Sequence, residues 1–241
     1  MGTIVLSGRM QAVADLVTHG SRVCDVGCDH GFVSIYLVQH KISPGVLAMD
    51  VREGPLRAAK EHVQEQGLEE LIETRLSDGL HNYNIGEADS LICAGMGGKL
   101  MMRILLEQKE KTDSFRELIL QPQSELEWFR GRLRDEGYYI VQENMIEEDG
   151  KFYPMMRAVK EKEQMPETAG IDRTLGDRYG ALLLQNKSEV LQSYLHCEKR
   201  IYQEIMQSLA KQGLEEKARK DRFQEMQRKL ADTERALEIM Q

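Results

Sequence analysis

Apolar runs alternate with amphipathic, helix-like segments along the chain from about residue 10 to residue 160. The short apolar runs predict strands, which we expect at residues 22–26, 46–50, 72–76, 88–94, 117–121, 138–146 and 152–160. The segments between them predict helices, which we expect at residues 9–18, 31–40, 55–66, 97–108 and 125–136. Strands that alternate with helices are typical of a mostly parallel sheet covered by helices on both faces.

The end of this region departs from the alternation. Only residues 147–151, with the sequence EEDGK, separate the last two predicted strands, which favours a tight antiparallel hairpin. A parallel sheet that finishes in an antiparallel hairpin is the pattern of class I, Rossmann-like methyltransferases. A dehydrogenase of Rossmann type would continue with another helix. The pattern therefore predicts an α/β fold of the class I methyltransferase kind.

The pattern changes after residues 161–176, a polar stretch that we interpret as a linker. Apolar positions then recur at spacings of three and four residues in two series, at 191–209 and 223–240, with Gly213 between them. This spacing predicts two helices with a heptad-like seam, most simply an antiparallel α-helical coiled-coil hairpin. Each helix can pair with the other, with another chain or with RNA.

The segment Val23–Gly31, with the sequence VCDVGCDHG, joins the first strand to the next helix. Asp25 and Asp29 flank Gly27 at the carboxyl end of that strand, where open α/β sheets bind ligands. A third acid, Asp50, ends the second strand about twenty residues later. The turn lacks the third glycine of the dinucleotide motif GxGxxG, and its acids would repel a diphosphate. A cationic ligand that carries a ribose, such as S-adenosylmethionine, suits them better.

Two of the later acids have candidate roles in such a pocket. Asp50 can accept hydrogen bonds from both ribose hydroxyls, and Val51 can then cover one face of the adenine. Asp78, which precedes Gly79, can accept a hydrogen bond from the adenine amino group. A turn that binds no ligand explains the Ser-Asp-Gly sequence at this place equally well.

The acids of the first turn have two interpretations. Asp25 or Asp29 can hold the methionine amine of the ligand, directly or through water. Alternatively, Asp29 only caps the helix that follows it. His30 can orient a substrate or donate a hydrogen bond, although many histidines are structural.

Residues 93–98, with the sequence CAGMGG, end the fourth predicted strand. Methyltransferases that act on amino groups often carry Asn/Asp-Pro-Pro-Tyr/Phe here, and this chain does not. Gly95, Gly97 and Gly98 instead allow a close backbone approach and leave amides free for a ligand. The alternative is a tight turn that serves only to join strand and helix.

Composition narrows the choice of function. The 241 residues carry a net charge of −8, which argues against a surface that is basic throughout, but residues 130–134 and 217–222 are candidate basic patches for nucleic acid. The four cysteines form no CxxC pair, so we expect no metal site, no disulfide and a reducing, cytoplasmic location. No apolar run approaches the roughly 18 residues of a membrane span, and the N-terminus does not resemble a signal peptide.

Several motifs together closely resemble a known family over nearly the whole chain. They are LSGRM at 6–10, DVGCDH at 25–30, SDGL at 77–80, AGMGG at 94–98, LILQPQ at 118–123 and EEDGKFY at 147–153. This set resembles the bacterial tRNA (adenine-N1)-methyltransferases that modify position 22 in the D-arm, the TrmK family. The resemblance implies an S-adenosylmethionine-binding methyltransferase domain at 1–160, followed by a linker and a C-terminal helical coiled-coil domain at 161–241.

The resemblance also implies roles for the motif residues. The cofactor site would comprise Asp25, Gly27, Asp29, His30, Asp50, Val51, Asp78, Gly79, Ala94, Gly95 and Met96. Asp29 and His30 would be the catalytic candidates. The substrate or RNA would contact Arg9, Gly97, Gly98, Gln121, Pro122 and Tyr153, with Arg9 holding a phosphate.

A mechanism follows from this resemblance. Adenine N1 already carries a lone pair, so methyl transfer to it needs no base and can depend mostly on positioning. Asp29, or the backbone carbonyls of Ala94 and Gly95, can accept the adenine amino hydrogens and stabilise the charge that develops on the ring. The base must be unpaired or extruded for N1 to be reached.

Three alternatives remain at this point. The first is the same fold acting on a different RNA, a small molecule or a protein side chain. The second is a nicotinamide-dependent oxidoreductase, and the third is a binding module whose helical tail recruits a partner. For the favoured function we expect tRNA as the partner, no membrane association and a monomer or weak dimer.

Overall fold

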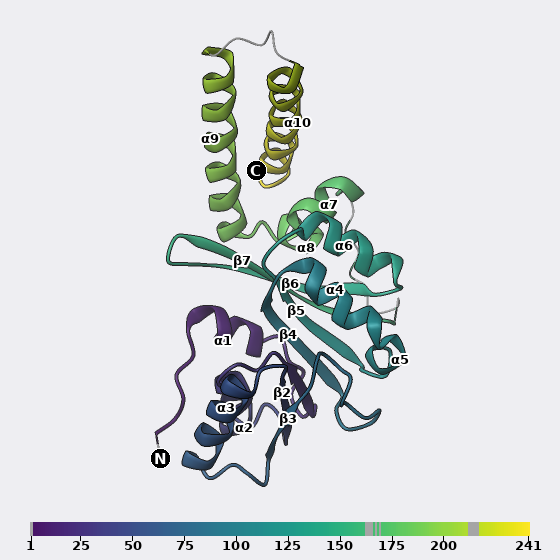
Figure 1. The fold of residues 1–241 in the computed structure, drawn as a ribbon. Helices are drawn as coiled ribbons and strands as arrows, with labels where there is room; N and C mark the ends of the chain where they lie inside the picture. The colour runs from purple at the N-terminus through teal and green to yellow at the C-terminus, as the bar shows by residue number, and fades with distance from the viewer. Residues whose placement is uncertain (1, 162–165, 167, 169, 212–216) are drawn as a thin grey trace. The chain divides into compact units, whose positions relative to one another are not determined.

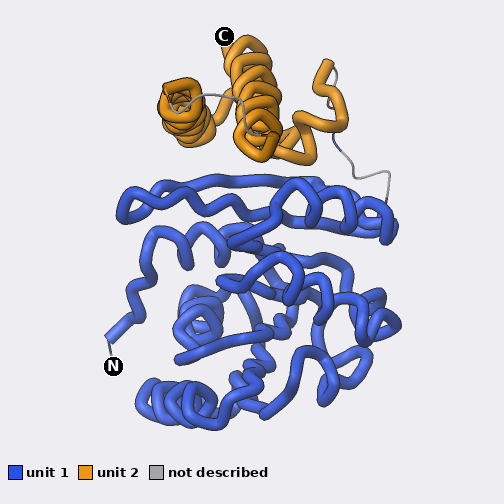
Figure 2. The backbone as a smooth tube through the Cα atoms, turned by 45° about the horizontal axis from the view of Figure 1, so that its top comes forward, with its two compact units in different colours: residues 1–166 blue, residues 167–241 orange. Residues whose placement is uncertain are grey.

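The computed structural model describes residues 2–161, 166, 168, 170–211 and 217–241 (Figure 1). Contacts divide the chain into two compact units, residues 1–166 and residues 167–241 (Figure 2). The boundary of the functional domains at 160/161 stays a prediction. None of the described helices is both long and apolar enough to cross a membrane.

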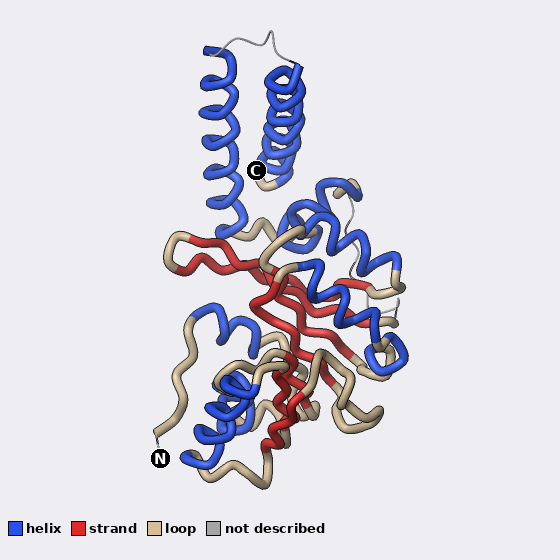
Figure 3. Tube along the Cα trace, in the orientation of Figure 1, coloured by secondary structure: helices blue, strands red, loops and turns tan. Residues whose placement is uncertain are grey.

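The first unit is built on one seven-stranded sheet with the order β3-β2-β1-β4-β5-β7-β6. Figure 3 shows the strands of this sheet in red. The strands are β1 (Val23–Val26), β2 (Val46–Asp50), β3 (Ile72–Leu76), β4 (Ser90–Met96), β5 (Glu117–Pro122), β6 (Tyr139–Glu148) and β7 (Lys151–Val159). The first five are parallel, whereas β7 runs antiparallel to both β5 and β6. The predicted fold class is therefore confirmed.

The hairpin between β6 and β7 follows directly from its sequence. Asp149 and Gly150 both have positive φ, at 52° and 71°. Two consecutive residues in this conformation make the turn whose twist matches that of the flanking strands, and Asp-Gly is a preferred sequence for it. The predicted loop of 147–151 is therefore longer than the turn that forms.

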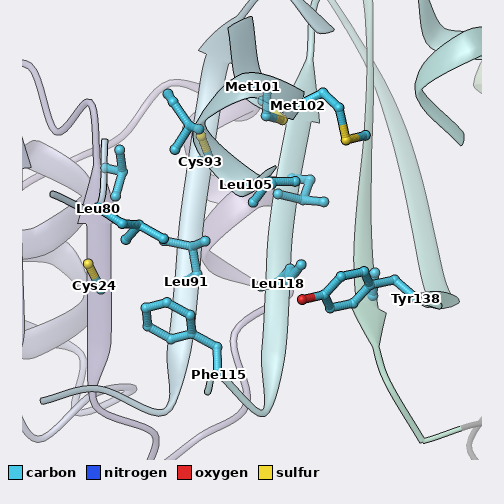
Figure 4. Close-up of a cluster of buried hydrophobic side chains, with 14 of the residues drawn as sticks. Cys24, Leu80, Leu91, Cys93, Met101, Met102, Leu105, Phe115, Leu118 and Tyr138 are labelled. Carbon is cyan, nitrogen blue, oxygen red and sulfur yellow. The ribbon is translucent and has the colours of Figure 1, made fainter. Parts of the chain in front are cut away.

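Helices cover both faces of the sheet. They are α1 (Gly8–Ala14), α2 (Phe32–Gln39), α3 (Glu53–Glu65), α4 (Gly98–Glu107), α5 (Lys109–Thr112) and α6 (Leu126–Asp135). One core packs beneath α4 and α6 and includes Leu91 and Leu118 (Figure 4). The other packs beneath α1, α2 and α3 and includes Ile92 and Ile119. Because successive strand residues point to opposite faces, a continuous apolar strand supplies both cores.

The first helix is shorter than the predicted 9–18 and ends at Ala14. A tertiary contact accounts for the early end. The backbone N–H and the hydroxyl of Thr18 donate to the carboxylate of Glu117, at 2.9 and 2.6 Å. Glu117 is buried at the start of β5, so these bonds satisfy a buried charge that the local sequence pattern does not reveal.

The second unit consists of α7 (Arg173–Tyr179), α8 (Ala181–Gln185), α9 (Glu189–Lys211) and α10 (Lys217–Ile239). The long helices α9 and α10 lie side by side and antiparallel (Figure 1). Gly213 lies outside the described residues. Most buried apolar residues of both helices come from the two predicted series, among them Leu191, Leu195, Met226 and Leu237, although Ala236 does not. The coiled-coil packing itself stays a prediction.

The interpretation of 161–176 as a linker is wrong for its last residues, because α7 begins at Arg173. The carboxylate of Asp172 caps this helix by accepting from the N–H of Leu175 at 3.0 Å. Within the unit, the Tyr179 hydroxyl contacts Glu198 at 3.1 Å and Thr233 at 2.9 Å. These contacts bury a short helix whose sequence is too brief for a periodic pattern.

Candidate active site

A cavity of about 460 Å³ opens where the parallel strands end, on the carboxyl side of the sheet. Its wall contains many of the predicted site residues, namely Arg9, Gly27, Asp29, Asp50, Val51, Asp78, Gly79, Ala94, Gly95 and Met96. Seven other predicted residues do not line the cavity. Six of them lie close by, namely Asp25, His30, Gly97, Gly98, Gln121 and Pro122, and the seventh is Tyr153. Loops from five strands thus converge on one site.

Asp50 is the most firmly held acid of the wall. It ends β2 and its side chain is 5% exposed. One carboxylate oxygen accepts from the N–H of Asp29 at 3.2 Å, and the other accepts from the N–H of Arg52 at 2.8 Å. The Arg52 guanidinium stands 3.7 Å away. These contacts hold a charged acceptor at the floor of the cavity in a fixed orientation.

Asp29 stands at the mouth beside Asp50. Its φ of 50° is unusual for a residue other than glycine, and its side chain is 60% exposed. Its carboxylate lies 3.8 Å from the Arg52 guanidinium and 3.8 Å from His30 Nε2. The contacts of Asp29 are therefore on the β1–β2 side of the cavity. Asp29 does not cap α2, since that cap is Gly31 and makes no side-chain hydrogen bond.

His30 belongs to an aromatic group outside the cavity. Its ring centroid lies 6.0 Å from those of Phe32 and His62, which stack on each other at 4.8 Å. The His30 carbonyl also contacts His62 Nδ1 at 3.0 Å. The structure therefore places His30 on the surface next to the site rather than in its wall.

Asp25 lies behind the wall and is almost completely buried. Burial raises the pKa of its carboxyl to about 6, the hydrogen bond from Ser34 opposes the rise, and the charge of Asp50 adds to it. The Ser34 hydroxyl donates to it at 2.7 Å. Asp25 thus places negative charge behind the cavity without reaching into it.

Asp78 and Gly79 form the far end of the wall, after β3. The Asp78 carboxylate pairs with the Arg103 guanidinium at 3.1 Å, and both side chains are about half exposed. Gly79 has a φ of 54°, and a methyl group there would approach Ile104 to 3.1 Å. Arg103 and Ile104 belong to α4, so this helix closes the cavity over the predicted adenine end.

The glycine-rich turn after β4 supplies the opposite end of the wall. Gly95 has a φ of 78°, and its N–H donates to Oε1 of the buried Gln121 at 3.0 Å. A methyl group on Gly98 would stand 2.5 Å from the Ser124 carbonyl oxygen. Gly98 is therefore required for packing at the start of α4, and Gly97 is the residue that caps it. Gln121 supports the turn from behind, and its Nε2 has no partner among the described residues.

Arg9 reaches this end of the wall from the start of α1. Its guanidinium carbon lies 5.1 Å from the centre of the Tyr153 ring, and its backbone N–H donates to Glu148 at 3.2 Å. Tyr153 and Glu148 come from β7 and β6, so the terminal hairpin positions Arg9. Tyr153 thus supports Arg9 from outside the cavity.

Sequence reasoning missed eight wall residues, namely Met10, Val26, Arg52, Ser77, Leu100, Arg103, Ile104 and Gln123. Arg52 and Ser77 are next to predicted residues, and adjacency to the strand ends could have identified them. Leu100, Arg103 and Ile104 lie on one face of α4, and no local motif marks that face.

The basic cluster at 130–134 does not form an open patch. The side chain of Arg130 is 3% exposed and pairs with Glu143 at 2.9 Å. Arg132 pairs with Glu136 at 2.6 Å. The residues at 217–222 lie at the start of α10, where all except Arg219 are exposed.

Comparison with known proteins now identifies the family. Residues 6–156 match the family model described as a methyltransferase domain. A Bacillus subtilis tRNA (adenine(22)-N(1))-methyltransferase is 34% identical over 213 residues, which cover 86% of this chain and 89% of that protein. This chain belongs to the tRNA (adenine(22)-N1)-methyltransferase family.

Solved structures of this family have the same fold. The crystal structure of the Bacillus subtilis m1A22 tRNA methyltransferase TrmK is 30% identical, with a TM-score of 0.84 over 97% of this chain and 99% of the other. The structure of M. capricolum TrmK in complex with S-adenosyl-homocysteine is 25% identical, with a TM-score of 0.82 over 98% and 99%. Both similarities span the methyltransferase unit and the helical unit.

Proposed function

We propose that this protein transfers a methyl group from S-adenosylmethionine to N1 of adenine 22 in tRNA, the reaction named for its Bacillus subtilis relative. The observation that carries the proposal is Asp50. A buried carboxylate, held by two backbone N–H groups at the floor of a cavity of about 460 Å³, suits the paired hydroxyls of a ribose.

The order of the strands along the sheet supports a particular arrangement of the cofactor. Asp78 follows β3, Asp50 ends β2, and Asp29 follows β1. These three acids suit, in that order, the adenine amino group, the ribose hydroxyls and the methionine ammonium. S-adenosylmethionine supplies, when bound, a methyl group on a positively charged sulfur. The acids surround that charge with negative potential, and the turn after β1 is not the GxGxxG turn that binds a diphosphate.

The same geometry favours a cofactor-binding role for Asp29 over a catalytic one. Its contacts are with the backbone and side-chain groups of the β1–β2 side, namely Asp50, Arg52 and His30. Adenine N1 needs no base to prepare its lone pair, so the reaction requires no proton acceptor in this position. The residues of the wall act by positioning and by electrostatic stabilisation of the cationic product.

The acceptor base would enter from the β4–β5 side, where Gly95 and Arg9 line the cavity. The Arg9 guanidinium can pair with a phosphate next to the extruded base. The exposed basic residues Lys217, Lys220 and Arg222 of α10 are candidates for contacts elsewhere on the tRNA. We further propose a cytoplasmic location, where tRNA and the cofactor meet, and a monomer or weak dimer.

Methyl transfer from labelled S-adenosylmethionine to unmodified tRNA, followed by nucleoside mass spectrometry, tests the proposal. We expect 1-methyladenosine, and its loss when adenine 22 is replaced by guanine. The absence of incorporation, together with tight binding of S-adenosylhomocysteine by calorimetry, would refute the tRNA substrate and favour a small-molecule or other RNA acceptor. Binding of NAD but not of S-adenosylhomocysteine would refute the methyltransferase itself.

A further inference from the structure

Gln123 is a wall residue that the motifs left without a role. It follows Pro122, the last residue of β5, and its backbone N–H donates to the Met96 carbonyl at 2.9 Å. This bond ties the residue to the end of β4. The Gln123 side chain is exposed and lines the cavity, so it faces the site from a fixed backbone.

The two glutamines of the Gln-Pro-Gln sequence behave differently. Gln121 is fully buried, and its Oε1 accepts from the N–H of Gly95. The amide of Gln123 has no hydrogen-bond partner among the described residues, so both its donor and its acceptor are available to a ligand. Gln121 therefore shapes the turn, whereas Gln123 is available for recognition.

Gln123 lies on the acceptor side of the cavity. A methyl group built on Gly95 would stand 3.6 Å from Arg9 Nη1 and 3.9 Å from Gln123 Nε2. The side chains of Arg9 and Gln123 therefore both stand over Gly95 at this end of the cavity. Asp50 and Asp78 lie across β1 and β4, at the ends of β2 and β3. An acceptor base above Gly95 would lie between a cation and an amide.

A side-chain amide has the donor and acceptor that match those of adenine. Its N6 amino group donates and its N7 accepts, and a glutamine or asparagine amide matches this pair with two hydrogen bonds. Those two atoms lie on the edge of the base that leaves N1 free. Arg9 has only donors, and the wall acids when ionised have only acceptors. Gln123 is the one amide side chain among the described residues of the wall.

We propose that Gln123 recognises the target adenine through N6 and N7, which leaves N1 exposed to the methyl donor. This inference rests on the proposed function. The Gln123 carbonyl accepts from the N6 amino group, so it also stabilises the positive charge that the base acquires. Guanine presents acceptors at both O6 and N7 and cannot make the same pair of bonds. Gln123 thus contributes to the choice of adenine.

A double-mutant cycle that combines one substitution in the protein with one in the tRNA tests the proposal. The substrates are tRNA with adenosine or with 7-deazaadenosine at position 22, since the analogue keeps N1 and N6 but lacks the N7 acceptor. The enzymes are wild type and Gln123→Ala. Gln64→Ala, an exposed glutamine on α3 outside the cavity, is the matched control. Affinity for S-adenosylhomocysteine checks that each variant keeps the cofactor site.

We expect Gln123→Ala to lower kcat/KM on normal tRNA by roughly ten- to a hundred-fold, with unchanged affinity for S-adenosylhomocysteine. Replacing adenosine by 7-deazaadenosine should lower kcat/KM of wild type roughly ten-fold. It should leave the already reduced kcat/KM of Gln123→Ala unchanged. The inference would be overturned if the analogue lowered kcat/KM of wild type and of Gln123→Ala by the same factor. Full activity of Gln123→Ala on normal tRNA would overturn it as well. An inactive wild type on normal tRNA would instead refute the proposed function, and the inference with it.

Discussion

The two sides of the cavity are built in different ways. On the β1–β2 side, Asp50 is buried and accepts two backbone hydrogen bonds, and Arg52 stands against it. On the β4–β5 side, Gly95 carries no side chain, and Gln123 is exposed without a partner among the described residues. The polar groups of the β1–β2 side are therefore oriented before a ligand binds, whereas the β4–β5 side stays accessible.

This difference matches the two ligands that we propose. A small cofactor gains affinity when its polar partners are already oriented, because little freedom is lost on binding. An extruded base belongs to a much larger molecule, so its side of the cavity must stay accessible. Four predictions test this division, and they run from the largest expected effect to the smallest.

Asp50→Ala should damage the cofactor side most. It removes a charged acceptor and leaves the N–H groups of Asp29 and Arg52 without their partner. We expect the affinity for S-adenosylhomocysteine to fall by more than a hundred-fold, about 3 kcal/mol. Calorimetry measures it, with Glu61→Ala, an exposed acid on α3, as the control. Unchanged affinity would show that Asp50 does not hold the ribose.

Asp25→Asn should change the dependence of stability on pH. Because burial raises the pKa of Asp25 from 3.8 to about 6, the folded state binds the proton more tightly than the unfolded state. The contribution of Asp25 to the stability of wild type should therefore fall as the pH rises from about 4 to 6, and stay level above that. The variant has no carboxyl to ionise. Between pH 4.5 and pH 8 it should gain about 2 kcal/mol relative to wild type.

Urea denaturation without cofactor at the two pH values measures this gain. Ser34→Ala serves as a comparison, because it removes the hydrogen bond to Asp25 and should raise the pKa of Asp25 further. A wild-type protein whose stability, relative to Asp25→Asn, is the same at both pH values would contradict the prediction.

Arg9→Ala should affect the acceptor side alone. Loss of one phosphate contact should raise KM for tRNA by about ten-fold, and should reduce the slope of log affinity against log salt by about one. The affinity for S-adenosylhomocysteine should not change. The control is Arg57→Ala, an exposed arginine of α3. A lower affinity of Arg9→Ala for S-adenosylhomocysteine would show that Arg9 contributes to the cofactor side, and would contradict the proposed division of the cavity.

Gly95→Ala should give the smallest effect. Its new methyl group would meet Arg9 at 3.6 Å, an ordinary contact, so the main cost is the φ of 78°, about 1 kcal/mol. Gly86→Ala is a matched control, since Gly86 has a φ of 94° and lies outside this cavity. Both variants should melt at a lower temperature, but only Gly95→Ala should lose methyl transfer, by a few-fold. Equal activities would mean that the space above Gly95 is not used.

The sequence predicted the parallel strands β1, β2 and β5 well because they are buried along their whole length. The bounds of β2 and β3 both match the prediction. β2 is a buried apolar run that stops at Asp50, whereas β3, with the sequence IETRL, is a partly exposed edge strand. The end of α1 was predicted less well, because the Thr18–Glu117 bonds join residues far apart in the chain. The helix α7 was missed because its burial depends on contacts with Glu198 and Thr233.

Local sequence patterns were also insufficient to predict parts of the candidate site. The motifs identified Asp29, Asp50 and Gly95 because strand ends and glycines mark backbone positions that any α/β sheet brings together. The motif-based prediction assigned a substrate contact to Gln121 and no role to Gln123, although Gln123 is the one that lines the cavity. The motifs also predicted a role for His30, which stays a prediction. Its ring lies outside the cavity wall, 3.8 Å from Asp29 and next to Phe32 and His62.

By itself, the sequence determined the order of the strands and of the longer helices, the fold class, the family and the strand ends at which a ligand binds, because periodicity and turn chemistry are local properties of the chain. The tertiary structure decided which side chains face the cavity and which support it from behind. That choice depends on the packing of α4, the β6–β7 hairpin and β5 around the strand ends. Burial and hydrogen bonds between distant residues, which no local pattern encodes, give Asp25 its raised pKa and leave Gln123 available to a base.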